Sequence, residues 1–183
     1  MSEPSRREQI LTTAAELFAA RGFHGVSVGD IGAACGISGP ALYKHFASKD
    51  AVLAEMLVSI SEHLLTGGRS LGSLEELVDF HVGFALRHRA LIVVQDRDWS
   101  SLPPDARERV RGLQREYVDV WAVRLRALDP DLDPTDRLDP ERARAHAAFG
   151  LINSTPHSGL LPDPEMATLL RQMALAALTA SPG

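Results

Sequence analysis

The sequence has little cysteine and no long hydrophobic run. Cys35 is the only cysteine in 183 residues, so no intramolecular disulfide can form, and we expect a reducing cytoplasm. The opening residues MSEPSRREQ lack the apolar run of a secretory signal. The longest apolar stretches, such as residues 90–94, are too short to cross a bilayer. These absences predict a cytoplasmic protein that does not enter the membrane.

Excess basic charge is also missing. The formal net charge is −5, whereas affinity for nucleic acid depends largely on neutralising phosphates. Residues 1–66 contain five Lys or Arg against seven Asp or Glu, so this part is not basic either. Residues 31–49, however, hold no acid and contain Lys44, His45 and Lys49. Any surface for DNA must therefore be small and local.

Apolar residues recur at helical spacing along most of the chain, which predicts an all-α protein. Ser5 with Glu8 and Ser27 with Asp30 have the spacing of capping boxes, so we expect helices over residues 6–21 and 28–35, ended by Gly22 and Gly36. Ser38 is expected to cap a third helix reaching residue 45. A fourth helix begins after Ser48 and is expected to break at residues 66–68.

Five further helices are predicted, at residues 74–87, 90–98, 104–128, 140–153 and 164–180, which makes about nine in all. Prolines at first helical positions mark the last two starts. Residues 129–139 are rich in Asp and Pro, which predicts a solvated connector between two helices. We place a DNA-binding domain at residues 4–64 and an effector-binding and dimerisation domain at residues 65–183.

Residues 26–50 carry the most specific pattern. They encode two short helices joined by a glycine-containing turn, followed by a third cap. In this arrangement the second helix projects from a small three-helix core into a major groove. The expected core residues are Ile31, Ala34, Ile37, Leu42 and Phe46.

This segment resembles the signature of the TetR family of bacterial transcriptional regulators over roughly residues 5–65. The resemblance is carried by Val28, Asp30-Ile31, Cys35-Gly36-Ile37-Ser38, Leu42-Tyr43-Lys44-His45-Phe46 and Ser48-Lys49-Asp50. It implies that DNA is approached by Ser27, Ser38, Gly39 and Pro40, with Tyr43 and His45 on the backbone and Lys49 on a phosphate. Because residues 39–41 offer no side-chain donor, few side chains can contact the base edges directly. Lys44 is the candidate for such a contact.

The resemblance also implies an effector pocket in the C-terminal domain and a homodimer formed by the last two helices. Phe80, Phe84 and His88 share one helix face, and Tyr117 and Trp121 bring polar atoms to an apolar stripe. Trp99 either closes the pocket mouth or anchors a turn. Asn153 either binds ligand or serves as a cap or dimer contact. We expect a hydrophobic effector of lipid, steroid or acyl-CoA type, and no cofactor.

Three alternatives differ in class. Ser154, His157 and Asp163 can be drawn as a hydrolase triad, but no Gly-x-Ser-x-Gly elbow surrounds them. His81 and His88 lie two turns apart without the Cys or His-x3-His partner of a metal site. A helical ligand-binding protein that has lost DNA binding is the third. The sequence therefore predicts a non-enzymatic, ligand-responsive regulator of operator DNA, expected to be a repressor, with activation left open.

Overall fold

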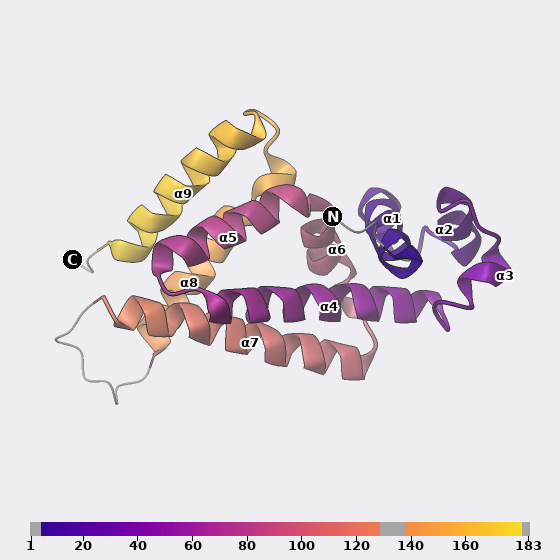
Figure 1. Cartoon of the computed structure of the whole chain (residues 1–183), viewed down its shortest axis with the longest axis horizontal. Helices are drawn as coiled ribbons and strands as arrows, with labels where there is room; N and C mark the ends of the chain where they lie inside the picture. Colours follow the sequence, from indigo (N-terminus) through magenta and orange to yellow (C-terminus); the bar gives the residue numbers. More distant parts are fainter. Residues whose placement is uncertain (1–4, 129–137, 181–183) are drawn as a thin grey trace. The chain divides into compact units, whose positions relative to one another are not determined.

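The computed structural model describes residues 5–128 and 138–180, and within them the regular elements are all helical (Figure 1). The chain forms two compact units. The first combines residues up to Ile60 with Ala90–Val110, and the second combines Ser61–Arg89 with residues from Arg111 onwards. The all-α prediction is confirmed. The predicted boundary at residues 64–65 lies inside a helix, close to the change of unit at Ile60, and residues 90–110 return to the first unit.

The first unit begins with α1 (Arg6–Arg21), α2 (Val28–Ala34) and α3 (Gly39–Leu42). Both predicted capping boxes form, at Ser5 and at Ser27. Gly36 has a φ of 67°, a left-handed value that glycine adopts without strain, and it turns the chain between α2 and α3. Helix α3 is shorter than predicted, because bonds from Lys44 N to Ala41 O and from His45 N to Leu42 O tighten the chain into a turn.

The core of this unit also draws on the first part of α4 (Lys49–Ser70), on α6 (Arg89–Asp98), on the 3-10 turn η1 (Trp99–Ser101) and on the start of α7 (Pro104–Arg126). Ala34 was expected in the core but is exposed, because it ends α2 on its outer side, and Ile37 is only partly buried. The fully buried large side chains of the unit include Ile10, Phe18, Val26, Ile31, Leu42, Leu53, Leu57 and Leu102.

Helix α6 is fixed to the C-terminal end of α1. The Arg97 guanidinium donates to the carbonyls of Phe18 and Ala19 in the last turn of α1, and the Phe18 carbonyl also accepts from the Gly22 amide. The buried carboxylate of Asp98 accepts from the Phe23 amide at 3.2 Å. These bonds join residues almost eighty positions apart, and they explain why α6 belongs with the first three helices.

The second unit contains the rest of α4 and α7 with α5 (Leu74–Arg87), α8 (Asp139–Ile152), the turn η2 (Thr155–His157) and α9 (Asp163–Thr179). Helix α9 packs on α5 and on α8. The predicted break at residues 66–68 is wrong, since α4 continues to Ser70. A Cβ on Gly67 would lie 2.4 Å from Cζ of Phe80, and one on Gly68 would lie 2.6 Å from Cε2 of Tyr117. These glycines serve close packing of rings against α4.

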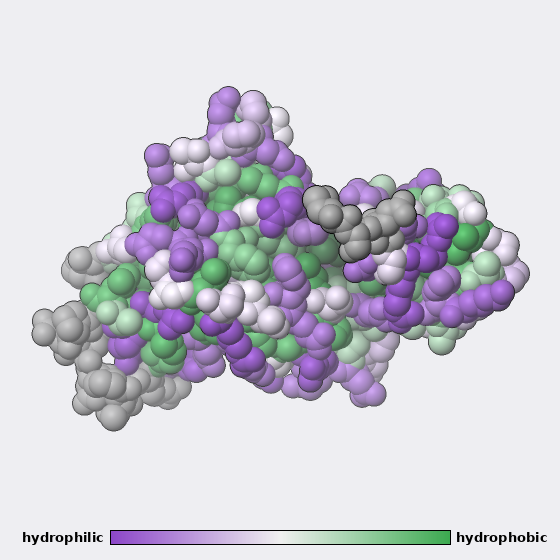
Figure 2. Space-filling view, viewed as in Figure 1, coloured by the Kyte–Doolittle hydropathy of each residue, from purple (hydrophilic) through white to green (hydrophobic). Residues whose placement is uncertain are grey.

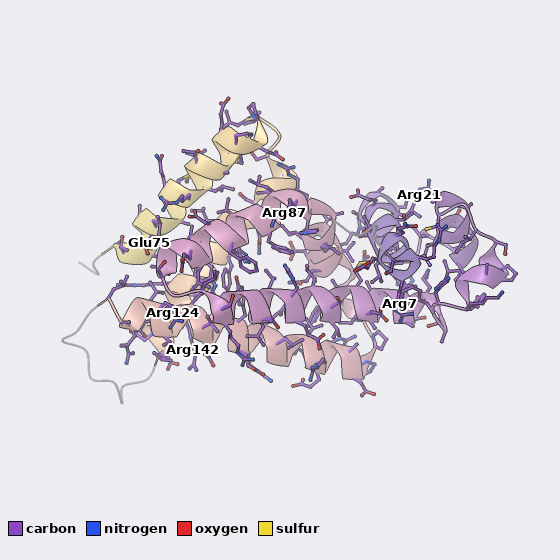
Figure 3. All side chains as sticks on the ribbon, viewed as in Figure 1. Arg7, Arg21, Glu75, Arg87, Arg124 and Arg142 are labelled. Atoms are coloured by element: carbon purple, nitrogen blue, oxygen red, sulfur yellow. The ribbon has the colours of Figure 1, made fainter. Side chains whose placement is uncertain are left out.

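Helices α7 and α8 are joined by a buried ion pair in which the Arg126 guanidinium donates to both oxygens of Glu141, at 2.7 and 2.9 Å. A half-buried pair between Arg142, labelled in Figure 3, and Asp119 lies on the same two helices. Residues 129–137 of the predicted connector lie outside the described part of the chain. Within that part, no helix is long and apolar enough to cross a membrane.

Candidate nucleic-acid interface and effector site

The N-terminal ends of α2 and α3 lie side by side. Ser27 and Ser38 occupy the N-cap positions, and each hydroxyl accepts a hydrogen bond from the amide three residues later. A Cβ on Gly39 would come within 3.9 Å of the Gly29 Cα. This approach depends on Gly32, where a Cβ would lie 2.9 Å from Ile37 O and 3.2 Å from Gly39 N. Two helix starts, each with amide groups that attract anions, thus share one face.

Seven of the eight predicted DNA-binding residues lie on this face or in the turn after α3. Ser27, Ser38, Pro40, Tyr43 and Lys44 are exposed, and Gly39 and His45 are half-buried. Tyr43 is 56% exposed, a large fraction for an aromatic side chain. The face offers hydroxyl groups and one ammonium group. The Asp30 carboxylate lies at the start of α2, where it accepts from the Ser27 amide and hydroxyl, and residues 31–49 bring no further carboxylate.

Lys49 occupies a different environment. Its Nζ donates to Phe23 O at 2.7 Å and to Val26 O at 2.8 Å, and it lies 4.2 Å from the centre of the Phe23 ring. The ammonium group therefore holds the loop before α2 against the start of α4. A phosphate contact by Lys49 stays a prediction, and it would require the exchange of both carbonyl bonds.

Arg7 supports the same face from α1 (Figure 3). Its guanidinium pairs with the Glu55 carboxylate, donates to the His45 carbonyl and lies 4.2 Å from the centre of the Phe46 ring. The hydrogen bond with Glu55 raises the pKa of Arg7. This side chain fixes the turn between α3 and α4, a role for which the sequence offered no signal beyond its charge.

In the second unit, four rings from three helices form what we call the aromatic cluster: His81 of α5, Tyr117 and Trp121 of α7, and Phe149 of α8. Phe149 stacks parallel to Tyr117 at 5.5 Å between ring centres and lies 4.9 Å from Trp121 and 4.8 Å from His81. Tyr117 and Trp121 were predicted from sequence. His81 was considered only as a metal ligand, although a histidine on the buried face of α5 was the available signal.

Burial keeps the polar groups of the cluster neutral. It lowers the pKa of His81 to about 4, an effect that the nearby Asn153 side chain partly offsets. Burial also raises the pKa of the Tyr117 hydroxyl above its ordinary value. Nδ1 of His81 lies 3.3 Å from the Tyr117 hydroxyl oxygen. The cluster therefore presents hydrogen-bonding dipoles in apolar surroundings and carries no charge at neutral pH.

Of the other predicted ligand residues, Phe80, Phe84 and His88 lie in the second unit, as the cluster does. Phe84 is buried beside His81, with 5.7 Å between ring centres, and His88 lies 5.2 Å from Phe84 at the end of α5. Burial lowers the pKa of His88, with a further contribution from Arg87. Phe80 lies against Gly67. Trp99 packs on the core of the first unit, and the structure does not bring it into the aromatic cluster.

The alternative sites are not assembled. The Ser154 hydroxyl donates to Leu151 O at 2.8 Å, and Asp163 pairs with Arg89 at 2.7 Å, so neither of these bonds goes to His157 as a hydrolase triad requires. Across residues 5–128 and 138–180, no group of three or more His, Cys, Asp or Glu side chains could hold a metal ion.

Two regions of the chain match known families. Residues 10–56 match the bacterial regulatory proteins of the tetR family, and residues 68–178 match a tetracyclin repressor-like C-terminal domain. The chain is 30% identical over 131 residues to the HTH-type transcriptional repressor KstR2 of Rhodococcus jostii. That alignment covers 67% of this chain and 64% of the relative, which is less than two thirds of its length.

Solved structures share the fold. A TetR-family transcriptional regulator from Bordetella parapertussis is 29% identical and superposes with a TM-score of 0.80, covering 94% of this chain and 95% of the other. A crystal structure of AibR in complex with isovaleryl coenzyme A and operator DNA gives a TM-score of 0.73 at 20% identity, covering 92% and 97% of the two chains.

Proposed function

The chain belongs to the TetR family of bacterial regulatory proteins, and we propose that it is a homodimeric repressor that leaves its operator DNA when a hydrophobic small molecule binds the second unit. The observation that carries the DNA-binding part is the shared face of α2 and α3, whose close approach depends on Gly32. The aromatic cluster supports the ligand-binding part, because it places hydrogen-bonding groups inside an apolar interior.

Contact with DNA is proposed to begin at phosphates. The hydroxyls of Ser38 and Tyr43 can donate to phosphate oxygens, whereas that of Ser27 donates to Asp30 Oδ2 and would have to exchange this bond. For Lys44 we propose a phosphate contact in place of the base contact predicted from sequence, and the amides at the helix starts favour anions. His45 lies beside them. Gly39 and Pro40 let the backbone approach the groove but read no base edge, so specificity rests on few direct contacts together with DNA shape and half-site spacing.

A second copy of the chain is proposed to pack on α8 and α9. Met166, Leu170 and Leu178 bury the inner side of α9 against its own unit. The outer side leaves Leu169 40% and Met173 47% exposed, one turn apart. Hydrophobic residues appear among hydrophilic ones over α5 and α9 (Figure 2). A two-fold axis would bring the same apolar stripe of both copies into contact. It would also separate the two faces formed by α2 and α3 by the distance between the two half-sites of an operator.

The effector is proposed to be hydrophobic, and the structure of AibR in complex with isovaleryl coenzyme A supports an effector of acyl-CoA type. A ligand that binds the dimer more tightly in its DNA-free conformation shifts the population away from DNA, by as much as its affinities for the two conformations differ. Release of the operator therefore needs no covalent step.

Sedimentation and fluorescence anisotropy together test this proposal. The wild type is expected to sediment as a dimer and to bind labelled DNA from its own upstream region. Met173→Glu is expected to yield monomers and to weaken DNA binding by more than tenfold, because two buried charges would face each other across the axis. Gln172→Glu adds the same charge at the neighbouring exposed position and should change neither. A monomeric wild type that binds DNA tightly would contradict the dimer.

A further inference from the structure

Three buried polar atoms in and beside the aromatic cluster lack a hydrogen-bond partner. They are Nε2 of His81, Nε1 of Trp121 and Oδ1 of Asn153. His81 is 3% exposed and Trp121 is fully buried. Buried polar groups in folded proteins almost always have partners, because an unmade bond loses the compensation for desolvation. The Asn153 side chain raises the pKa of His81 and the Trp121 side chain lowers that of Tyr117, so these groups lie near one another, but neither pair reaches the geometry of a hydrogen bond. Three poorly paired atoms at the meeting point of α5, α7 and the end of α8 favour a partner that is not part of the chain.

The direction of each missing bond can be assigned. The Tyr117 hydroxyl keeps its proton and can donate it to Nδ1 of His81 at 3.3 Å, which leaves the histidine proton on Nε2. The indole Nε1 of Trp121 is always a donor. His81 and Trp121 meet edge to face, with ring centres 5.9 Å apart and planes at 83°. The N–H groups of His81 and Trp121 and the amide oxygen of Asn153 can therefore all bond to one group of a ligand.

We propose that His81, Trp121 and Asn153 bind a single uncharged oxygen of the hydrophobic effector, either a carbonyl or a hydroxyl. A carbonyl oxygen has two lone pairs and can accept from both N–H groups. A hydroxyl can accept from one of them and donate to Asn153 Oδ1. This inference rests on the proposed ligand site of the second unit and specifies its chemistry.

We call the set of His81, Trp121 and Asn153 the anchor. A carboxylate group of a ligand fits the anchor poorly. Burial holds His81 in its neutral form, so the anchor supplies N–H dipoles without a positive charge to offset the desolvation of an anion. A pure hydrocarbon also fits poorly, since it would leave all three atoms unpaired. Sites built to hydrogen-bond a ligand reject analogues that lack the bonding group.

Phe149 controls access to the anchor. It is the one partly exposed member of the aromatic cluster, and its ring lies within 5.5 Å, centre to centre, of the other three. Movement of this one ring opens the space above His81 and Trp121, and the apolar part of the effector takes its place. The oxygen then sits at the inner end of the ligand and the hydrocarbon at the outer end.

The indole N–H of Trp121 reports directly on this bond. The chain has two tryptophans, so a Trp99→Phe variant labelled with ¹⁵N leaves one indole cross-peak in the NMR spectrum. The probes are tetralin, 1-tetralone, 1-tetralol and tetralin-1-carboxylate, which share one skeleton and differ in the oxygen group. The ketone and alcohol are expected to move the Trp121 indole proton downfield and to bind about tenfold more tightly than tetralin.

Trp121→Phe keeps an aromatic ring and removes the donor. In this variant the ratio of the affinities for tetralone and tetralin is expected to fall severalfold, whatever the affinity for tetralin itself. The probe series on the Trp99→Phe protein needs no change in the cluster, so the test stands even if Trp121→Phe fails to fold. Equal affinity for ketone and hydrocarbon, tighter binding of the carboxylate, or no binding of the ketone would each overturn the proposal.

DNA anisotropy on the same samples separates this inference from the proposed function. Intact DNA binding without an oxygen preference contradicts only the anchor. An oxygen preference in a protein that binds no DNA supports the anchor and contradicts the repressor.

Discussion

Acidification should destabilise the protein through His81. Burial lowers its pKa to about 4 in the folded chain, whereas an unfolded chain restores the ordinary value of 6.5. Below pH 6.5 the unfolded state binds a proton that the folded state excludes. The free energy of unfolding is therefore unaffected well above pH 6.5 and decreases as the pH falls from 6.5 towards 4. Between about pH 7.5 and pH 5, these two pKa values correspond to a loss of about 2 kcal/mol.

Urea unfolding followed by circular dichroism at the two pH values measures this loss, and His81→Leu supplies the comparison. The variant removes the titrating group, so its pH dependence should be weaker by about 2 kcal/mol, whatever its stability at neutral pH. His88, whose pKa burial also lowers, contributes in the same direction and remains in both proteins. The same pH dependence in wild type and variant would refute a neutral, buried His81.

Three substitutions probe other parts of the structure. Gly32→Ala should lower the free energy of unfolding by about 1–3 kcal/mol in urea titrations, because its Cβ would meet backbone atoms. Gly29→Ala is the control, because its Cβ would make only ordinary contacts and should not destabilise the protein. Equal effects of the two substitutions would contradict the close approach of α2 and α3 at Gly32. Lys49→Met should cost about 2 kcal/mol through its two carbonyl bonds, and unchanged stability with weakened DNA binding would favour the phosphate role instead. Glu141→Gln should lower stability by about 2 kcal/mol by weakening the pair with Arg126, and an unchanged urea midpoint would argue against that pair.

Local signals in the sequence were enough to predict most helices. The capping boxes at Ser5 and Ser27 act over four residues, and both form as expected; a third forms at Ser73. The helix break predicted at residues 66–68 failed because it rests on the low helix propensity of glycine, which does not end α4. The role of these glycines depends on rings of α5 and α7 that reach α4 only in the folded unit.

Contacts between residues far apart in the sequence account for what local patterns could not predict. Lys49 carries the charge expected of a phosphate ligand, yet its Nζ bonds to carbonyls more than twenty residues away. His81 becomes a site candidate only when α7 and α8 bring Tyr117 and Phe149 against it. Arg97 and Asp98 tie α6 to α1 across the sequence. No periodicity within a single helix encodes these contacts.

The central claim is that the face formed by α2 and α3 binds DNA, and its most direct test is the salt dependence of binding to DNA from the upstream region. Wild type should bind tightly, and its affinity should fall linearly with salt on logarithmic axes. Lys44→Met should weaken binding and reduce the magnitude of that slope by about one for each subunit's lost phosphate contact. A wild type that binds no upstream fragment, or a Lys44→Met protein with unchanged affinity and slope, would contradict the account.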